Sequence, residues 1–218
     1  IRDRSKLQMA RSLYDAIPAT DFRKYSYLDP DRTTYAYQSV RGDAWLDEQP
    51  DYLSLKFRPV GGDYKTYSVG AAADIPVMRV EEMYLIEAEA VGASQSVAAG
   101  VLLLDNFVKQ YRQPDYNFST SDLRSLQLEV LRQMRIEFWG EGTAFPTAKR
   151  LKPDVIQHYE GTNFKEDHFK INCKGVKPNW TLMIPKTEVD SNTALQGMNN
   201  PDPSGAILQR PTPIGTFA

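Results

Sequence analysis

Residues 96–112, SVAAGVLLLDNFVKQYR, carry the most regular apolar repeat of the chain. The apolar residues of this repeat recur at intervals of four, three, four and three: Val97, Val101, Leu104, Val108 and Tyr111. Such spacing places them on one face of an α-helix. Pro114 follows two residues after this stretch and does not continue a helix. The stretch therefore predicts a helix that buries one face in a core.

Two more helices are predicted beside it. Residues 78–91 follow Pro76, which suits a first helical turn, and stop at Gly92. Residues 120–139 begin with a capping-type signal at 119–122. Three helices joined by short turns predict consecutive antiparallel packing. We expect the core between them to contain Val101, Leu104, Val108, Val130 and Met134.

The remainder of the chain predicts little regular structure. Residues 5–17 have helical spacing, and residues 52–57 alternate as a strand does. No series of strands follows, and polar loops dominate after Lys152. The predicted fold class is therefore mainly α with long irregular loops and minor β-strand, below about a fifth of residues.

Composition excludes several classes of protein. The 218 residues carry a net charge of −2, which gives no global reason to bind nucleic acid. A lone Cys173 forms no intrachain disulfide, and no apolar run is long enough to cross a bilayer. His158 and His168 lie in a loop-like region, so we expect no metal site and no cofactor. The basic segment 149–186 is interpreted as a solvated face rather than a phosphate contact.

Four ordered stretches carry a resemblance to the SusD/RagB family. Residues 74–90, DIPVMRVEEMYLIEAEA, resemble its most recognisable helix, and residues 135–142, RIEFWGEG, are similar to an Arg- and Glu-containing element that follows. Residues 20–24, TDFRK, are similar to its Asp-x-Arg signal. Residues 183–190, MIPKTEVD, with Asn200-Pro201, resemble its closing signals.

The resemblance implies a fold, a function and a location. It implies a SusD-like arrangement in which helical hairpins pack with tetratricopeptide-like helices. Residues 1–218, which begin with Ile1, resemble the carboxy-terminal portion, without the amino-terminal half and its lipid anchor. Family members are Bacteroidetes lipoproteins of the outer-membrane surface that bind glycans or other nutrients. They deliver the ligand to a SusC-like TonB-dependent transporter, and contact the membrane only through that anchor.

An aromatic-rich, turn-rich stretch at residues 22–67 suits the binding of sugars, whose rings have one C–H face and a rim of hydroxyls. We predict a ligand platform there, centred on Trp45. The other candidates are Tyr35, Tyr37 and Tyr52, with Arg41 and Asp43 for the hydroxyl rim. In the competing interpretation, Trp45 fixes its loop to the core, and both remain open.

Catalytic motifs are missing from the sequence, which has no nucleophile elbow, phosphate-binding loop or dinucleotide fingerprint. We therefore expect no enzyme. The rival interpretation is a polysaccharide-degrading domain that uses Glu137 or Glu141, and a third is a pure protein-interaction scaffold. Charged residues within the packed helices are instead expected to form structural ion pairs: Arg79, Glu87, Arg135 and Glu137.

Overall fold

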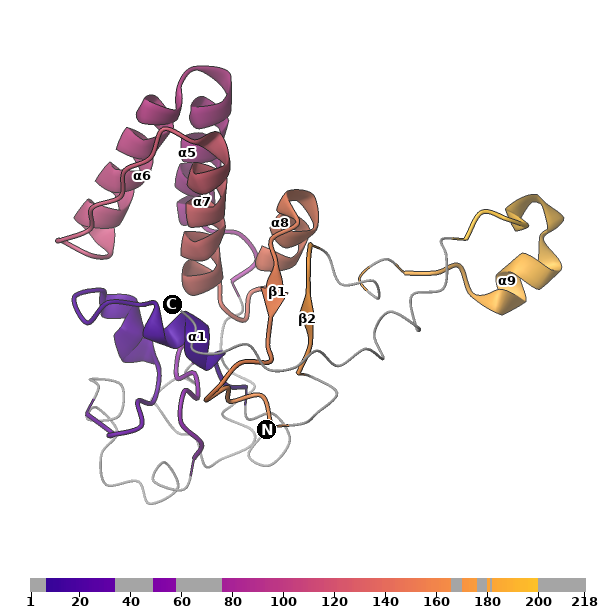
Figure 1. The fold of residues 1–218 in the computed structure, drawn as a ribbon, viewed down its shortest axis with the longest axis horizontal. Helices are drawn as coiled ribbons and strands as arrows, with labels where there is room; N and C mark the ends of the chain where they lie inside the picture. Colours follow the sequence, from indigo (N-terminus) through magenta and orange to yellow (C-terminus); the bar gives the residue numbers. More distant parts are fainter. Residues whose placement is uncertain are drawn as a thin grey trace. The chain divides into compact units, whose positions relative to one another are not determined.

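The computed structural model describes residues 7–33, 49–57, 76–165, 170–175, 180 and 182–199 (Figure 1). The chain divides into two compact units, residues 1–145 and 146–218. Their elements are, in order, α1 (Arg11–Asp15), η1 (Phe22–Ser26), α5 (Val80–Ser94), α6 (Val97–Tyr111), α7 (Leu123–Glu137), α8 (Ala144–Leu151), β1 (Val155–Ile156), β2 (Asn172–Cys173), α9 (Lys186–Ser191) and η5 (Thr193–Leu195). The mainly helical class is as predicted. Among the described residues no helix is long and apolar enough to span a membrane.

Helices α5 and α6 form a tight hairpin in the first unit. Ser96 caps α6, its hydroxyl accepting a hydrogen bond from the amide of Ala99 at 3.2 Å. The helices approach closely because glycine faces glycine: a Cβ added to Gly100 would lie 2.7 Å from the Cα of Gly92. The absence of these two side chains therefore sets how closely the helices pack.

Helix α7 completes the bundle in a direction that differs from the predicted one. Residues 112–122 run back along the bundle, so α6 and α7 both end at the same end and α5 begins there (Figure 1). Helix α7 is therefore antiparallel to α5 but parallel to α6. The prediction of consecutive antiparallel packing was wrong for this pair, because the link after Tyr111 is long enough to return the chain.

The bundle core contains the residues expected from the helical spacing. Leu104, Val108, Val130 and Met134 are buried there, and Val101 is half-buried against them. Leu85 and Ala88 of α5, with Phe107, Leu126 and Phe138, complete the centre of the cluster. The three helices thus share one apolar core.

A second apolar cluster of the first unit surrounds α1, which is shorter than the predicted helix over residues 5–17. The predicted strand over residues 52–57 is reduced to two isolated bridges, Leu53 with Gln8 and Ser54 with Tyr27. The physical reason lies at Tyr52, whose φ of 65° is left-handed rather than extended. The Tyr52 amide donates to the backbone oxygen of Leu28, and the Tyr52 carbonyl accepts from the amide of Met9, so the residue bonds two different segments.

The second unit contains short elements held by side-chain amides. Strands β1 and β2 pair antiparallel, and the Asn172 side chain accepts from the amides of Gln157 and His158. Asn199 bonds both the amide and the carbonyl of Ile184, just before α9. Pro146 falls in the first turn of α8, where its missing N–H is not needed.

Candidate functional site

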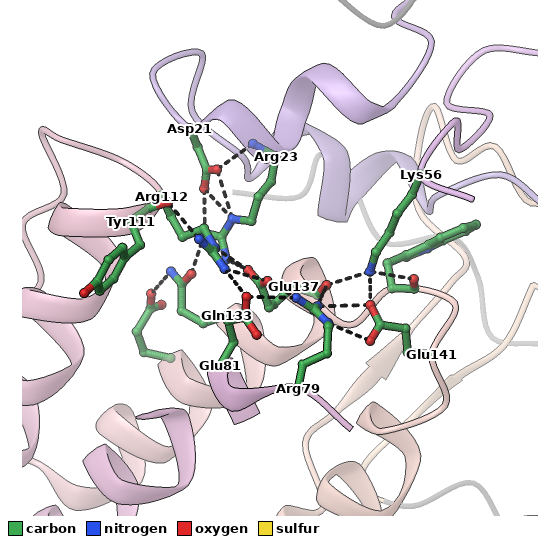
Figure 2. A network of polar contacts seen from close by, with 12 residues as sticks. Asp21, Arg23, Lys56, Arg79, Glu81, Tyr111, Arg112, Gln133, Glu137 and Glu141 are labelled. Atoms are coloured by element: carbon green, nitrogen blue, oxygen red, sulfur yellow. Dashed lines mark hydrogen bonds and ion pairs between the residues drawn. The ribbon is translucent and has the colours of Figure 1, made fainter. Parts of the chain in front are cut away.

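A network of charged side chains lies at the end of the bundle where three helix ends meet (Figure 2). Arg79 is the N-cap residue of α5, Arg112 is the C-cap residue of α6, and Glu137 is the last residue of α7. Each therefore projects from a point where the helical hydrogen-bond ladder stops. The fold thus brings together Arg79 and Glu137, which lie 58 positions apart along the chain.

Glu137 is the centre of the network, and only 5% of its side chain is exposed. Its carboxylate accepts two hydrogen bonds from Arg112, at 2.7 and 2.9 Å. Arg79 donates another at 2.8 Å, and Arg23 a further one at 3.2 Å. Three guanidinium groups thus surround one buried carboxylate.

Arg23 reaches this centre from η1, where Asp21 is the N-cap residue. The Asp21 carboxylate accepts from the Arg23 amide at 3.0 Å and from its guanidinium at 2.6 and 2.9 Å. The same guanidinium donates to the side-chain oxygen of Gln133 at 2.7 Å. Asp21 and Gln133 therefore orient Arg23 toward Glu137.

Glu141 forms the second carboxylate centre. Arg79 donates to both of its oxygens, at 2.9 and 3.0 Å, and the Lys56 ammonium also bonds it. Lys56 in addition donates to the backbone oxygen of Glu137 at 2.7 Å. Gly140 on one side of Glu141 and Gly142 on the other have φ of 79° and 85°, which tightens the turn that carries it.

Aromatic rings flank two of the arginines. The Arg112 guanidinium lies 5.4 Å from the ring centroids of both Phe22 and Phe107, and that of Arg79 lies 4.7 Å from Phe138. Cation–π contacts of this kind keep a guanidinium oriented while its edge donates hydrogen bonds. Phe107 and Phe138 are buried in the bundle core, so each covers one side of its guanidinium.

The charges of the network balance. Four cations face four carboxylates: Arg23, Lys56, Arg79 and Arg112 against Asp21, Glu81, Glu137 and Glu141. Burial by itself raises the pKa of the Glu137 carboxyl, but the hydrogen bonds and charge of Arg112, with those of Arg79 and Arg23, outweigh it and lower the pKa to about 2. Burial lowers the pKa of the Lys56 ammonium, and the contact with Glu141 opposes that effect.

This arrangement is suited to fixing structure rather than to acid–base chemistry. A carboxyl group that acts as a general acid has to hold a proton near neutral pH, which requires a raised pKa. Glu137 is ionised there, and both of its oxygens are already occupied by arginines. A buried and paired carboxylate of this kind joins segments of the chain.

The structure corrects part of the predicted set of ion pairs. It contains the pair between Arg79 and Glu137. Arg135 and Glu87 are exposed and form no ion pair among the described residues, so that part of the prediction was wrong. The reason is helical geometry: Arg135 lies two positions before Glu137 and therefore points to nearly the opposite side of α7.

The sequence prediction missed several members of the network. Arg23 and Asp21 carry a sequence signal, since they are the charged residues of the TDFRK stretch. Arg112 is the last residue of a predicted helix, and Lys56 lies inside a predicted strand. Neither pattern indicates that the residue pairs with a distant carboxylate. Only their position in space identifies these two as partners of the carboxylates.

The predicted ligand platform lies mostly beyond the part of the chain that the structure describes. Tyr35, Tyr37, Arg41, Asp43 and Trp45 fall in residues 34–48, outside the described residues, and remain predictions. Tyr52, by contrast, is only 8% exposed, and its ring centroid lies 5.0 Å from that of Tyr14. Tyr52 is thus a core residue, which corrects its assignment to an exposed platform.

The described residues contain no group of three or more side chains that could hold a metal ion. His158 is half-buried in the second unit, and His168 lies outside the described residues. Comparison of the chain with family models, curated proteins and solved structures finds no match. The charge network and the sequence stretches that meet there are therefore the features of the described residues that bear on function.

Proposed function

We propose that this chain is a nutrient-binding protein of the SusD/RagB type, which captures a glycan at the outer-membrane surface. In this proposal it passes the ligand to a SusC-like TonB-dependent transporter, and a lipid anchor holds the full-length protein to the membrane. The observation that carries the proposal is the meeting of three sequence stretches in one network. The stretches at 20–24, 74–90 and 135–142, which carry the resemblance, supply Arg23, Arg79 and Glu137.

That meeting supports the proposal for a physical reason. Residues of one stretch alone could resemble a family by chance, but buried charges have to be paired across the fold. The stretches contain the same charged residues that hydrogen-bond one another over 58 and 114 positions of sequence. The charged residues that resemble the family's motifs are therefore also the ones that pair with one another in the fold.

The network also supports a binding role for the aromatic-rich stretch. Arg23 and Lys56 lie toward the two ends of residues 22–67, and both are fixed to carboxylates at the end of the bundle. Trp45 lies between these two anchors along the chain. A binding loop gains affinity when its ends are held, because less chain entropy is lost when the ligand binds.

The rival enzyme function is less well supported. Glu137 and Glu141 are the carboxylates it would use, and Arg79 bonds both. Glycosidases place one protonated and one ionised carboxyl on either side of the scissile bond. Here one arginine donates hydrogen bonds to both groups, which is the arrangement of a structural ion pair rather than of two carboxyls on opposite sides of a sugar.

A glycan-binding screen tests the proposal. We expect the chain to retain at least one glycan from a panel of oligosaccharides in calorimetric titration, without releasing reducing ends. Trp45→Ala should weaken that binding by at least tenfold at an unchanged melting temperature, whereas the matched variant Trp180→Ala should leave affinity unchanged. Release of reducing ends would establish the enzyme instead. Retained affinity in Trp45→Ala, or a melting temperature lowered by several degrees, would instead show that Trp45 fixes its loop to the core.

A further inference from the structure

The side chain of Arg32 joins the two stretches of chain on either side of residues 34–48. Its guanidinium donates to the backbone oxygen of Gln49 at 2.6 Å and to the carboxylate of Asp51 at 2.8 Å. It also donates to the backbone oxygen of Asp29 at 2.5 Å, within its own stretch. One side chain thus connects residues that lie 17 and 19 positions apart along the sequence.

The buried residue Asp29 fixes the first of these stretches as far as its last described residue. The Asp29 carboxylate accepts hydrogen bonds from the amide of Thr33 at 2.8 Å and from its hydroxyl at 2.6 Å. The amide of the preceding residue, Leu28, donates to the backbone oxygen of Leu53 at 3.0 Å, which connects the first stretch to the second. Residues 34–48 lie outside the described residues, but the chain is held by hydrogen bonds on both sides of them.

The backbone of Arg32 is strained, which shows that its side-chain contacts determine its conformation. Its φ of 56° lies in the left-handed region, which residues other than glycine adopt at a cost in energy. A glycine would take up the same conformation without strain. Strain of this kind persists where the surrounding contacts hold the residue in place, and the hydrogen bonds of the guanidinium supply such contacts here. The arginine therefore costs backbone energy and connects the two stretches.

We propose that Arg32 is a positioning residue of the glycan platform, which fixes the two ends of residues 34–48 before the glycan binds. This inference rests on the proposed function, because Trp45 and the other platform candidates in residues 34–48 are predictions from the sequence. A stretch of chain whose ends are joined has less conformational entropy to lose on binding than one whose ends are separate. Arg32 thus raises affinity through the ends of the chain segment, without contacting the glycan.

Two substitutions of Arg32 separate this role from a general effect on stability. The probe is the oligosaccharide that the original chain retains from the panel, and the measurement is calorimetric titration. We expect Arg32→Ala to weaken binding about tenfold, because it removes the guanidinium. Arg32→Gly removes the same group but suits the left-handed backbone. It should therefore weaken binding as much as Arg32→Ala while lowering the melting temperature less.

A matched control and a double substitution locate the effect. Tyr116→Phe removes a 2.7 Å hydrogen bond in the bundle, so it destabilises the same unit without changing any contact of Arg32 and should leave affinity unchanged. Asp51→Ala removes one acceptor of the guanidinium and should weaken binding less than Arg32→Ala. The two changes together should weaken it no more than Arg32→Ala alone, because both break the same connection.

The outcomes distinguish this inference from the proposed function. Unchanged affinity in both Arg32 variants, or additive losses for Arg32→Ala and Asp51→Ala, would overturn the inference and leave the proposed function standing. An equal loss in Tyr116→Phe would also overturn it, since affinity would then follow overall stability. If the original chain retained no oligosaccharide, the proposed function would fail and this inference with it. Loss of affinity in both Arg32 variants, with none in Tyr116→Phe, would support it.

Discussion

Replacing Glu137 by glutamine removes one negative charge from the centre of the network and keeps the shape of the side chain. Four hydrogen bonds from Arg23, Arg79 and Arg112 converge on this carboxylate. The gap between its ordinary pKa of 4.5 and the value of about 2 corresponds to about 3 kcal/mol, because each tenfold change in proton affinity is worth about 1.4 kcal/mol. Glutamine resembles the protonated acid, so we expect Glu137→Gln to lower the free energy of unfolding by about 3 kcal/mol at pH 7.

The stabilisation that Glu137 provides depends on pH. The pKa of Glu137 is depressed in the folded chain, so its contribution is complete above the unfolded pKa and is lost as pH falls through the folded pKa. The difference between the original chain and Glu137→Gln should therefore shrink from about 3 kcal/mol at pH 7 to about 1.4 kcal/mol at pH 3. It should approach zero below about pH 2.

Urea unfolding followed by far-UV circular dichroism measures the difference, since the bundle supplies most of the helix. Glu87→Gln is the matched control: it removes an exposed glutamate of α5 that forms no ion pair among the described residues, and should change stability by less than about 0.5 kcal/mol. A difference below about 1 kcal/mol for Glu137→Gln at pH 7 would refute the reasoning. So would a difference that stays constant down to pH 3.

Three further substitutions test the packing and the charges. Arg79→Ala leaves three carboxylates short of a partner and should cost about 3 kcal/mol in urea unfolding, whereas Arg135→Ala should cost less than about 0.5 kcal/mol; equal losses would contradict the assignment of the network. Gly100→Ala places a Cβ 2.5 Å from a backbone oxygen of α5 and should cost about 2 kcal/mol. An unchanged melting temperature would show that α5 and α6 can move apart without loss of stability. Tyr116→Phe removes a 2.7 Å hydrogen bond to the Glu129 carboxylate and should cost about 1.5 kcal/mol. An unchanged melting temperature would show that this hydrogen bond contributes nothing to stability.

The bundle could be predicted from the sequence because its signal is local. The helix predicted over residues 96–112 is observed as Val97–Tyr111, since apolar spacing and capping residues act within a few positions. The direction of α7 could not be predicted in this way. The link after Tyr111 contains no pattern that distinguishes a short turn from a return along the bundle, and packing against α5 decides it. At Tyr52 the backbone conformation likewise depends on partners in Met9 and Leu28.

The candidate site was only partly predictable, for a related reason. The sequence indicates that charges near apolar stripes need partners, and it points to Arg79 and Glu137. It does not indicate which distant residue supplies each partner. Arg23 and Arg112 enter the network through η1 and the C-terminus of α6, and neither position follows from the spacing around Glu137.

The sequence separations within the network have a consequence for the order of folding. The α5–α6 hairpin closes over a two-residue link, whereas Arg23 and Glu137 are 114 positions apart. Short loops close at a lower entropic cost than long ones, so the hairpin is expected to form before the rate-limiting step and the ion pairs after it. Contacts made after that step govern how fast the native chain opens. The ion pairs of the charged centre should therefore slow unfolding. Arg23→Ala should raise the unfolding rate and leave the refolding rate nearly unchanged.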